Sequence, residues 1–176
     1  WFRWFNYVCD GTLVLTGTNT FEGNITISAG TLKIDGAGVL ENGSYDGTIA
    51  NSGTFIYSST TDQTLAGVIS GSGALTKEEN STLTLTVANT YNGTTTITTG
   101  TLKVTGTLAQ TAVTVDTNGT YDVDATDTVL SIAGAGTIDL TGAALTAGDG
   151  NNQTFSGVFN GANDFTKVGS GTLTLS

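Results

Sequence analysis

Four aspartates stand close together in the second half of the chain, at Asp116, Asp122, Asp124 and Asp127. Closely spaced carboxylate oxygens are the ligands that Ca²⁺ prefers. However, the sequence has neither an EF-hand loop nor the glycine-rich nonapeptide of calcium-binding β-rolls. We therefore expect the four side chains to line a solvated outer edge and predict no metal site, with a calcium site as the alternative.

Residues for acid–base or nucleophilic catalysis are scarce. The chain has no His, which removes the commonest general base and the commonest transition-metal ligand. Cys9 is the only cysteine and can form no disulfide within the chain, so we expect a free thiol, with a bridge between two chains as the alternative. The sequence therefore predicts no catalytic residue and no cofactor, and we expect that the protein is not an enzyme.

The composition also excludes several partners. The formal net charge is −10, only 11% of residues are charged, and no basic patch is present, which disfavours binding to nucleic acid or to an anionic membrane surface. No apolar run approaches the roughly 20 residues of a membrane-spanning helix, so we predict no membrane insertion by this segment. Thr and Gly are abundant and Pro is absent, which is typical of paired strands joined by tight turns.

The elements that carry these residues recur along the chain. Residues 12–34 match 82–104 without a gap, and residues 63–77 match 153–167 at a larger offset. The segment 171–175 starts the same unit again. Such tandem similarity indicates a solenoid, in which no coil can bury its apolar face alone.

The repeats divide the sequence into four parts. We expect an aromatic-rich N-terminal segment (1–11) that is a partial preceding coil or a cap, repeat unit one (12–81), repeat unit two (82–171) and the start of a third unit (172–176). Because a half-coil change would turn apolar side chains outward, we expect the longer unit two to contain about one extra whole coil.

Apolar residues alternate with polar ones in runs of three to five residues, as in Leu83–Leu85 and Leu102–Val104. A period of two is the strand period, and no stretch has the 3.6 period of a helix. We therefore predict an all-β right-handed parallel β-helix, a fragment of a longer rod, with about 20 residues per coil. Leu83 and Leu102 should point inward and Thr84 outward. A β-sandwich is the alternative, which the tandem repeat disfavours.

Residues 73–104, GALTKEENSTLTLTVANTYNGTTTITTGTLKV, closely resemble the autotransporter-associated β-strand repeat. The resemblance covers most of residues 10–176. Three departures from the family pattern, which has glycine at these positions, put the local turn type in doubt: Glu79, Ser81 and Val87. The residues that match the pattern are Lys77, Lys167, Gly169, Gly171, Asn89–Tyr91 and Gly100–Leu102.

The resemblance implies a passenger of the type V secretion system, exported to the surface of a Gram-negative bacterium through an outer-membrane translocator barrel that is absent from this segment. The expected location is extracellular and associated with the outer membrane. Members of the family include adhesins and proteins whose active domains are carried on a β-helical stalk. The repeat has no assigned catalytic residues.

We expect a structural rod that acts as stalk or scaffold, with an adhesive surface as a further role. The alternative is an adhesin that binds a host-surface glycan or protein, or a second copy of itself. A polysaccharide-active enzyme is more remote, because the only arginine is Arg3, in the N-terminal segment. An ice-binding face is equally remote, because steps such as Thr82–Thr84 recur irregularly.

Aromatic residues are the last candidates for binding. Phe21 and Tyr91 share one repeat position, where we expect packing over the coil edge and not sugar stacking. The N-terminal aromatics cap the open end of the helix or are foreign sequence, and both readings stay open: Trp1, Phe2, Trp4 and Phe5.

Overall fold

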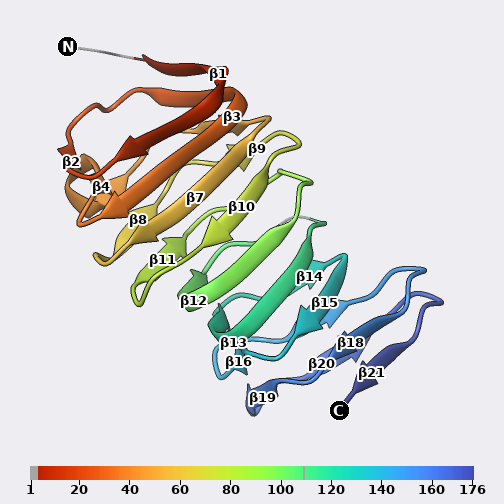
Figure 1. The fold of residues 1–176 in the computed structure, drawn as a ribbon. Helices are drawn as coiled ribbons and strands as arrows, with labels where there is room; N and C mark the ends of the chain where they lie inside the picture. The colour runs from red at the N-terminus through yellow and green to blue at the C-terminus, as the bar shows by residue number, and fades with distance from the viewer. Residues whose placement is uncertain (1–3, 109) are drawn as a thin grey trace.

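The computed structural model describes residues 4–108 and 110–176, without the side chains of Trp4, Val8 and Cys9. The chain winds into a right-handed parallel β-helix of about eight turns, with 60% of residues in strands. The strand pairings of the described residues are parallel, as expected when every coil returns to the side from which it started. Figure 1 shows the coils stacked from the N-terminus to the C-terminus along one axis.

The strands form three sides of a tube, which we call sides A, B and C in chain order. Long strands bend at a corner and serve two sides. Side A consists of the first parts of β1 (Trp4–Leu15) and β3 (Asn24–Gly36), then β6 (Ile49–Asn51), β9 (Ile69–Ser70), β14 (Asp127–Val129), β17 (Leu145–Ala147) and β20 (Phe165–Lys167).

Side B faces the viewer in Figure 1. It consists of the second parts of β1 and β3, β7 (Thr54–Ser59), β10 (Ala74–Lys77), the first parts of β12 (Thr95–Val104) and β13 (Ala112–Val123), β15 (Ser131–Gly134), β18 (Gln153–Phe155) and β21 (Leu173–Leu175).

Side C contains the remaining strands and the second parts of β12 and β13. A single 3₁₀ turn, η1 (Glu41–Gly43), interrupts it. Its strands are β2 (Thr18–Asn19), β4 (Val39–Leu40), β5 (Ser44–Tyr45), β8 (Gln63–Leu65), β11 (Thr82–Leu85), β16 (Thr137–Leu140) and β19 (Val158–Gly161).

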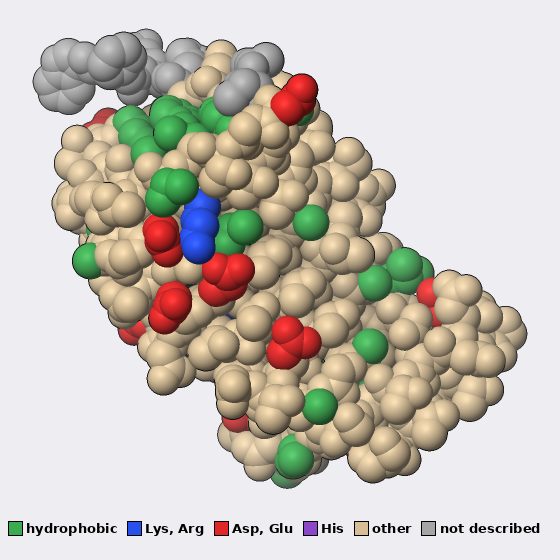
Figure 2. Space-filling model, viewed as in Figure 1, with side chains coloured by type: hydrophobic (Ala, Val, Ile, Leu, Met, Phe, Trp, Pro, Cys, Tyr) green, Lys and Arg blue, Asp and Glu red, His purple; other side chains and the backbone are tan. Residues whose placement is uncertain are grey.

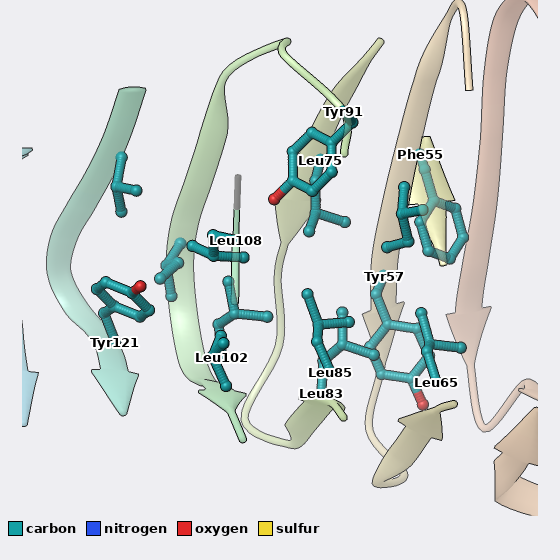
Figure 3. Packing of buried hydrophobic residues seen from close by; sticks show 14 of the residues in the cluster. Phe55, Tyr57, Leu65, Leu75, Leu83, Leu85, Tyr91, Leu102, Leu108 and Tyr121 are labelled. Atoms are coloured by element: carbon teal, nitrogen blue, oxygen red, sulfur yellow. The ribbon is translucent and has the colours of Figure 1, made fainter. Parts of the chain in front are cut away.

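The core is a set of inward columns, one side chain per coil. Leu83 and Leu102 are neighbours on side C and both are fully buried, while Thr84 between the buried Leu83 and Leu85 is partly exposed, as predicted. Figure 3 shows the rings and aliphatic chains of successive coils filling the space between the sides. Burial of this apolar surface, at about 25 cal/mol per Å², is the main stabilising contribution.

The coils differ in length because their corners differ. Ile25 pairs with Ile49 in the next coil, whereas Tyr121 pairs with Ile138, so the coil that begins at Ile25 is the longer of the two. The long coil contains η1, where Glu41, Asn42 and Gly43 all have positive φ. Within the described residues no helix is long and apolar enough to cross a bilayer.

Equivalent residues of the two repeat units lie on different sides of the tube. From Leu13 the register on side B runs through Leu32 and Phe55 to Leu75, and Leu83 lies on the next side, C. Repeat unit one therefore spans three complete coils and one further side of the tube.

Unit two was expected to contain about one extra whole coil, and its surplus is not a whole number of coils. From Leu83 the register on side C passes through Leu102, Tyr121 and Ile138 to Phe159. Two further sides then lead to Leu173, which lies on side B. The surplus over unit one is one coil and one further side. The repeat tolerates this because its apolar alternation suits each of the three sides.

Candidate functional site

The four aspartates that suggested calcium binding do not form one cluster. Two of them, Asp122 and Asp124, lie together on the outer surface, where both contact the ammonium group of Lys103, Asp122 at 3.0 Å. Hydrogen bonds from Lys103 to these two carboxylates raise the pKa of the lysine. Within the described residues no three His, Cys, Asp or Glu side chains are placed to hold a metal ion.

Asp127 is not on a solvated edge, and that expectation is wrong. Its side chain is buried, with 1% exposure. The carboxylate accepts hydrogen bonds from the Tyr121 hydroxyl (2.6 Å), the Leu108 amide (3.0 Å) and the Thr128 amide (2.8 Å). Burial, and then the charge of Asp127, raise the pKa of Tyr121 well above its usual value, so the hydroxyl keeps the proton that it donates. The group is a structural network closed to solvent.

Lysines at one repeat position make similar ion pairs on two different sides. Lys33 on side B contacts Asp35 at 3.5 Å and Glu78 at 3.4 Å. Lys103, which occupies the same position in repeat unit two, lies on side C. Figure 2 shows the side B cluster as a blue patch bordered by red on an otherwise mostly neutral surface. Partly exposed pairs of this kind contribute about 0–1 kcal/mol each.

Lys77 and Lys167, which share one repeat position, each bind carbonyl oxygens of the corner that follows their strand. The Lys77 ammonium donates to the carbonyls of Glu78 and Glu79, and the Lys167 ammonium donates to those of Val168 (2.6 Å) and Gly169 (3.2 Å). Lys77 is fully buried, and desolvation lowers its pKa to about 8. Each lysine therefore joins the end of its strand to the corner that follows it.

The same corners explain the departures from the glycine pattern. Glu79 has φ +61°, close to the φ of +76° at the equivalent Gly169. The turn type is therefore kept, at the cost of placing a side chain in the left-handed region. Ser81 replaces another glycine, and its buried hydroxyl donates to the Ser59 carbonyl at 2.6 Å.

The repeated asparagines connect coils, a role that sequence reasoning missed. The Asn89 amide donates to the carbonyls of Val87 and Thr107, both at 3.0 Å, and its oxygen accepts from the Ile69 amide at 2.9 Å. These partners belong to three successive coils. The equivalent Asn19 donates to the Gly17 carbonyl in its own coil (2.8 Å) and to a carbonyl of the following coil. The sequence signal for this role was the recurrence of Asn before a Thr and an aromatic residue in both repeat units.

The aromatic residues at the repeat position pack toward the core, where we had expected packing over the coil edge. Tyr91 is fully buried with its hydroxyl 2.7 Å from Oγ1 of Thr95. Phe21 is partly buried and stacks on Phe5, with ring centroids 5.1 Å apart. Trp1 and Phe2 lie outside the described residues, as do the side chains of Trp4 and Cys9.

One cavity near the C-terminal coils, lined by Ser131, Ala147 and Lys167 among others, has space for about one water molecule. The Thr-x-Thr pairs do not stack regularly: on side C, Thr84 is followed in the next coil by Lys103 and then by Asp122.

Comparison with known proteins identifies the repeat. A family model described as passenger-associated-transport-repeat matches residues 10–34, 75–104 and 165–176. The chain is 36% identical over 198 residues to the adhesin BmaC autotransporter of Brucella suis biovar 1 (strain 1330); the match covers 91% of this chain but 6% of that protein. No solved structure matches significantly. This chain thus carries the repeat that is found in autotransporter passengers.

Proposed function

We propose that this chain is a length of rigid stalk in a surface-exposed autotransporter passenger, not an enzyme. The observation that carries the proposal is the ladder of parallel strands that continues on side B from β1 to β21. Its hydrogen bonds run along the axis of the rod, and an inward column of apolar residues reinforces them. Such a rod holds whatever lies at its end away from the cell surface.

The expected partner of the whole passenger is an outer-membrane translocator barrel, and the expected location is the cell surface. The family match and the relative that is named an autotransporter support both. Since the chain spans only 6% of that relative, these remain proposals about the longer protein.

The runner-up function is adhesion to a host glycan or protein by this segment itself. The name of the relative, an adhesin, favours it. The described surface favours it less, because the large apolar side chains that are clearly exposed are aliphatic and three of the five belong to the last coils: Val14, Leu130, Val158, Val168 and Leu175.

One deletion separates stalk from adhesin. In the full-length protein, removal of residues 13–172 takes out eight coils and joins Gly-Thr before Leu13 to Leu173, which lies on the same side. For a stalk, surface display and adhesion of bacteria to host cells persist, and the rod seen by electron microscopy shortens by about 38 Å. Loss of adhesion with display intact would instead assign adhesion to this segment.

A further inference from the structure

Asparagine is followed directly by glycine at four places in the chain, and all four asparagine side chains are exposed: Asn42, Asn92, Asn118 and Asn160. An asparagine in this position is chemically labile, because glycine has no Cβ to keep its amide nitrogen away from the asparagine side chain. The sequence ranks the four steps equally. The structure does not, because the four glycines are packed differently.

Three of these glycines are pressed against the backbone of the preceding coil. A Cβ atom placed on Gly93, Gly119 or Gly161 would lie 2.2, 2.3 and 2.3 Å, respectively, from a backbone atom of that coil. Gly119 and Gly161 are also paired in parallel ladders. Backbone at such close range cannot give way, so these three peptides are fixed in place.

Gly43, in the 3₁₀ turn η1, is packed more loosely. The atom nearest to a Cβ placed there is the Asp62 carbonyl oxygen, at 3.5 Å, which is an ordinary contact distance. The turn is also strained, because Glu41 and Asn42 have φ values of +45° and +55°, in the left-handed region. Among the described residues the Asn42 side chain makes no hydrogen bond. The peptide between Asn42 and Gly43 therefore has space to turn and a strained conformation to leave.

The backbone is anchored on both sides of this turn. The amide of Leu40, just before the turn, donates to Oε1 of Gln63 at 2.8 Å, and Ser44, just after it, pairs with Thr64. Both contacts reach the following coil. A reaction within residues 41–43 is thereby confined to the turn.

We propose that Asn42 is a site of spontaneous deamidation in the folded protein. The Gly43 amide nitrogen attacks Cγ of Asn42, so that a new C–N bond forms and the side-chain nitrogen leaves as ammonia, which takes up the amide proton. The product is a cyclic succinimide, and water opens it at either carbonyl to give aspartate or isoaspartate. In sum, one water is consumed, one ammonium ion is released and the chain gains one negative charge. The proposal is independent of the stalk function.

The position of the reaction decides what it does to the rod. Isoaspartate continues the main chain through its side-chain carbon, which adds one atom to the backbone. In η1 this atom lengthens a turn between two anchored residues. At Asn118 it would shift the register of β13 against β12. The rod therefore survives the reaction at Asn42, and its close coil packing suppresses the reaction at Asn118.

The test compares ageing of the folded chain with ageing of the chain in guanidinium chloride, both at pH 7.4 and 37 °C. Peptide mapping by mass spectrometry follows each asparagine–glycine step. Methyl transfer from S-adenosylmethionine by a purified isoaspartate carboxyl methyltransferase measures isoaspartate. The ratio of the folded rate to the denatured rate is taken for each step, so that intrinsic differences cancel. We expect the ratio at Asn42 to be at least tenfold higher than the ratios at the other three steps.

Two variants serve as the matched pair. Asn42→Gln should abolish the fast reaction of the folded chain, since glutamine has to close a larger ring, and Asn92→Gln should leave that reaction unchanged. The rate at Asn42 should also rise with pH, because the attacking amide of Gly43 must lose its proton. A less than tenfold difference between Asn42 and the other steps would overturn the proposal. Loss of the β-sheet circular dichroism on ageing would overturn it too, because the reaction would then not be confined to the turn.

Discussion

The Tyr121 hydroxyl donates a 2.6 Å hydrogen bond to Oδ2 of Asp127 inside the tube, where both side chains are almost completely buried. The carboxylate also accepts hydrogen bonds from two backbone amides, so each of its oxygens has a donor. Replacement by Asn would turn an NH₂ group toward one of these donors. We expect Asp127→Asn to lower the free energy of unfolding by about 2–3 kcal/mol in urea denaturation. The surface control Asp122→Asn should cost less than about 1 kcal/mol; equal losses would contradict the inward placement.

The buried ammonium of Lys77 should make the free energy of unfolding depend on pH in the alkaline range. Its pKa is lowered to about 8 by desolvation, from 10.5 in the unfolded chain. Between these values the unfolded state binds more protons, so the free energy of unfolding should rise with pH. The window ends near pH 10, above which the raised pKa of buried tyrosines such as Tyr121 has the opposite effect.

Thermal melting from pH 7.5 to 9.5 measures this dependence. In the Lys77→Met variant the rise of the melting temperature with pH should disappear. Lys167→Met is the matched control, because Lys167 makes the corresponding corner contacts while exposed, and its rise should persist. A parent chain whose melting temperature is flat or falls over this range would show that Lys77 is not desolvated.

Restoring glycine should have opposite effects at two positions only two residues apart. Glu79→Gly relieves a left-handed backbone and should stabilise the chain by about 1 kcal/mol. Ser81→Gly removes the buried hydroxyl that donates to the Ser59 carbonyl and should destabilise it by about 1–2 kcal/mol. Chemical denaturation of both variants measures the difference, and the same sign for both would refute this account of the corner.

The alternation of inward and outward side chains along β11 predicts which substitutions the rod tolerates. Leu83→Asp buries an unpaired charge and should prevent folding, whereas Thr84→Asp should cost less than about 1 kcal/mol, since it lies beside Lys103 on the outer surface. Circular dichroism and gel filtration distinguish the two outcomes. Similar behaviour of both variants would mean that the inner and outer faces are exchanged.

Calcium should leave the stability unchanged. Asp122 and Asp124 are engaged by Lys103, and Asp127 points into the core. We expect the melting temperature in millimolar CaCl₂ to equal that in chelator within about 1 °C, since a ligand that does not bind the folded state cannot shift it. A rise of several degrees that MgCl₂ does not reproduce would reveal a calcium site.

Alternation of apolar and polar residues, together with the tandem repeat, was sufficient to predict the fold and the inward direction of Leu83 and Leu102. The same rule would have placed Asp127 correctly, since it is two residues before the buried Val129. Treating the aspartates as a cluster in sequence obscured this, because neighbours in sequence alternate between the core and the solvent.

The position of each repeat around the tube could not be predicted in this way. It depends on the number of residues in every corner, and the coil that begins at Ile25 is longer than the coil that begins at Tyr121. The repeat pattern fixes how far apart Leu13 and Leu83 lie along the chain. It contains no information on which side each one reaches, because Leu, Ile and Val columns suit all three.

The shift of equivalent residues from side B to side C bears on how such genes change. Unequal crossing-over between the matching segments at Leu13 and Leu83 would add or remove one repeat unit, which is three coils and a third. Strands beyond the junction then find partners on an adjacent side, so the rod survives the event. Everything beyond the junction is turned by about a third of a revolution relative to the part before it, and recombination thereby alters which direction a distal domain faces as well as how far it extends.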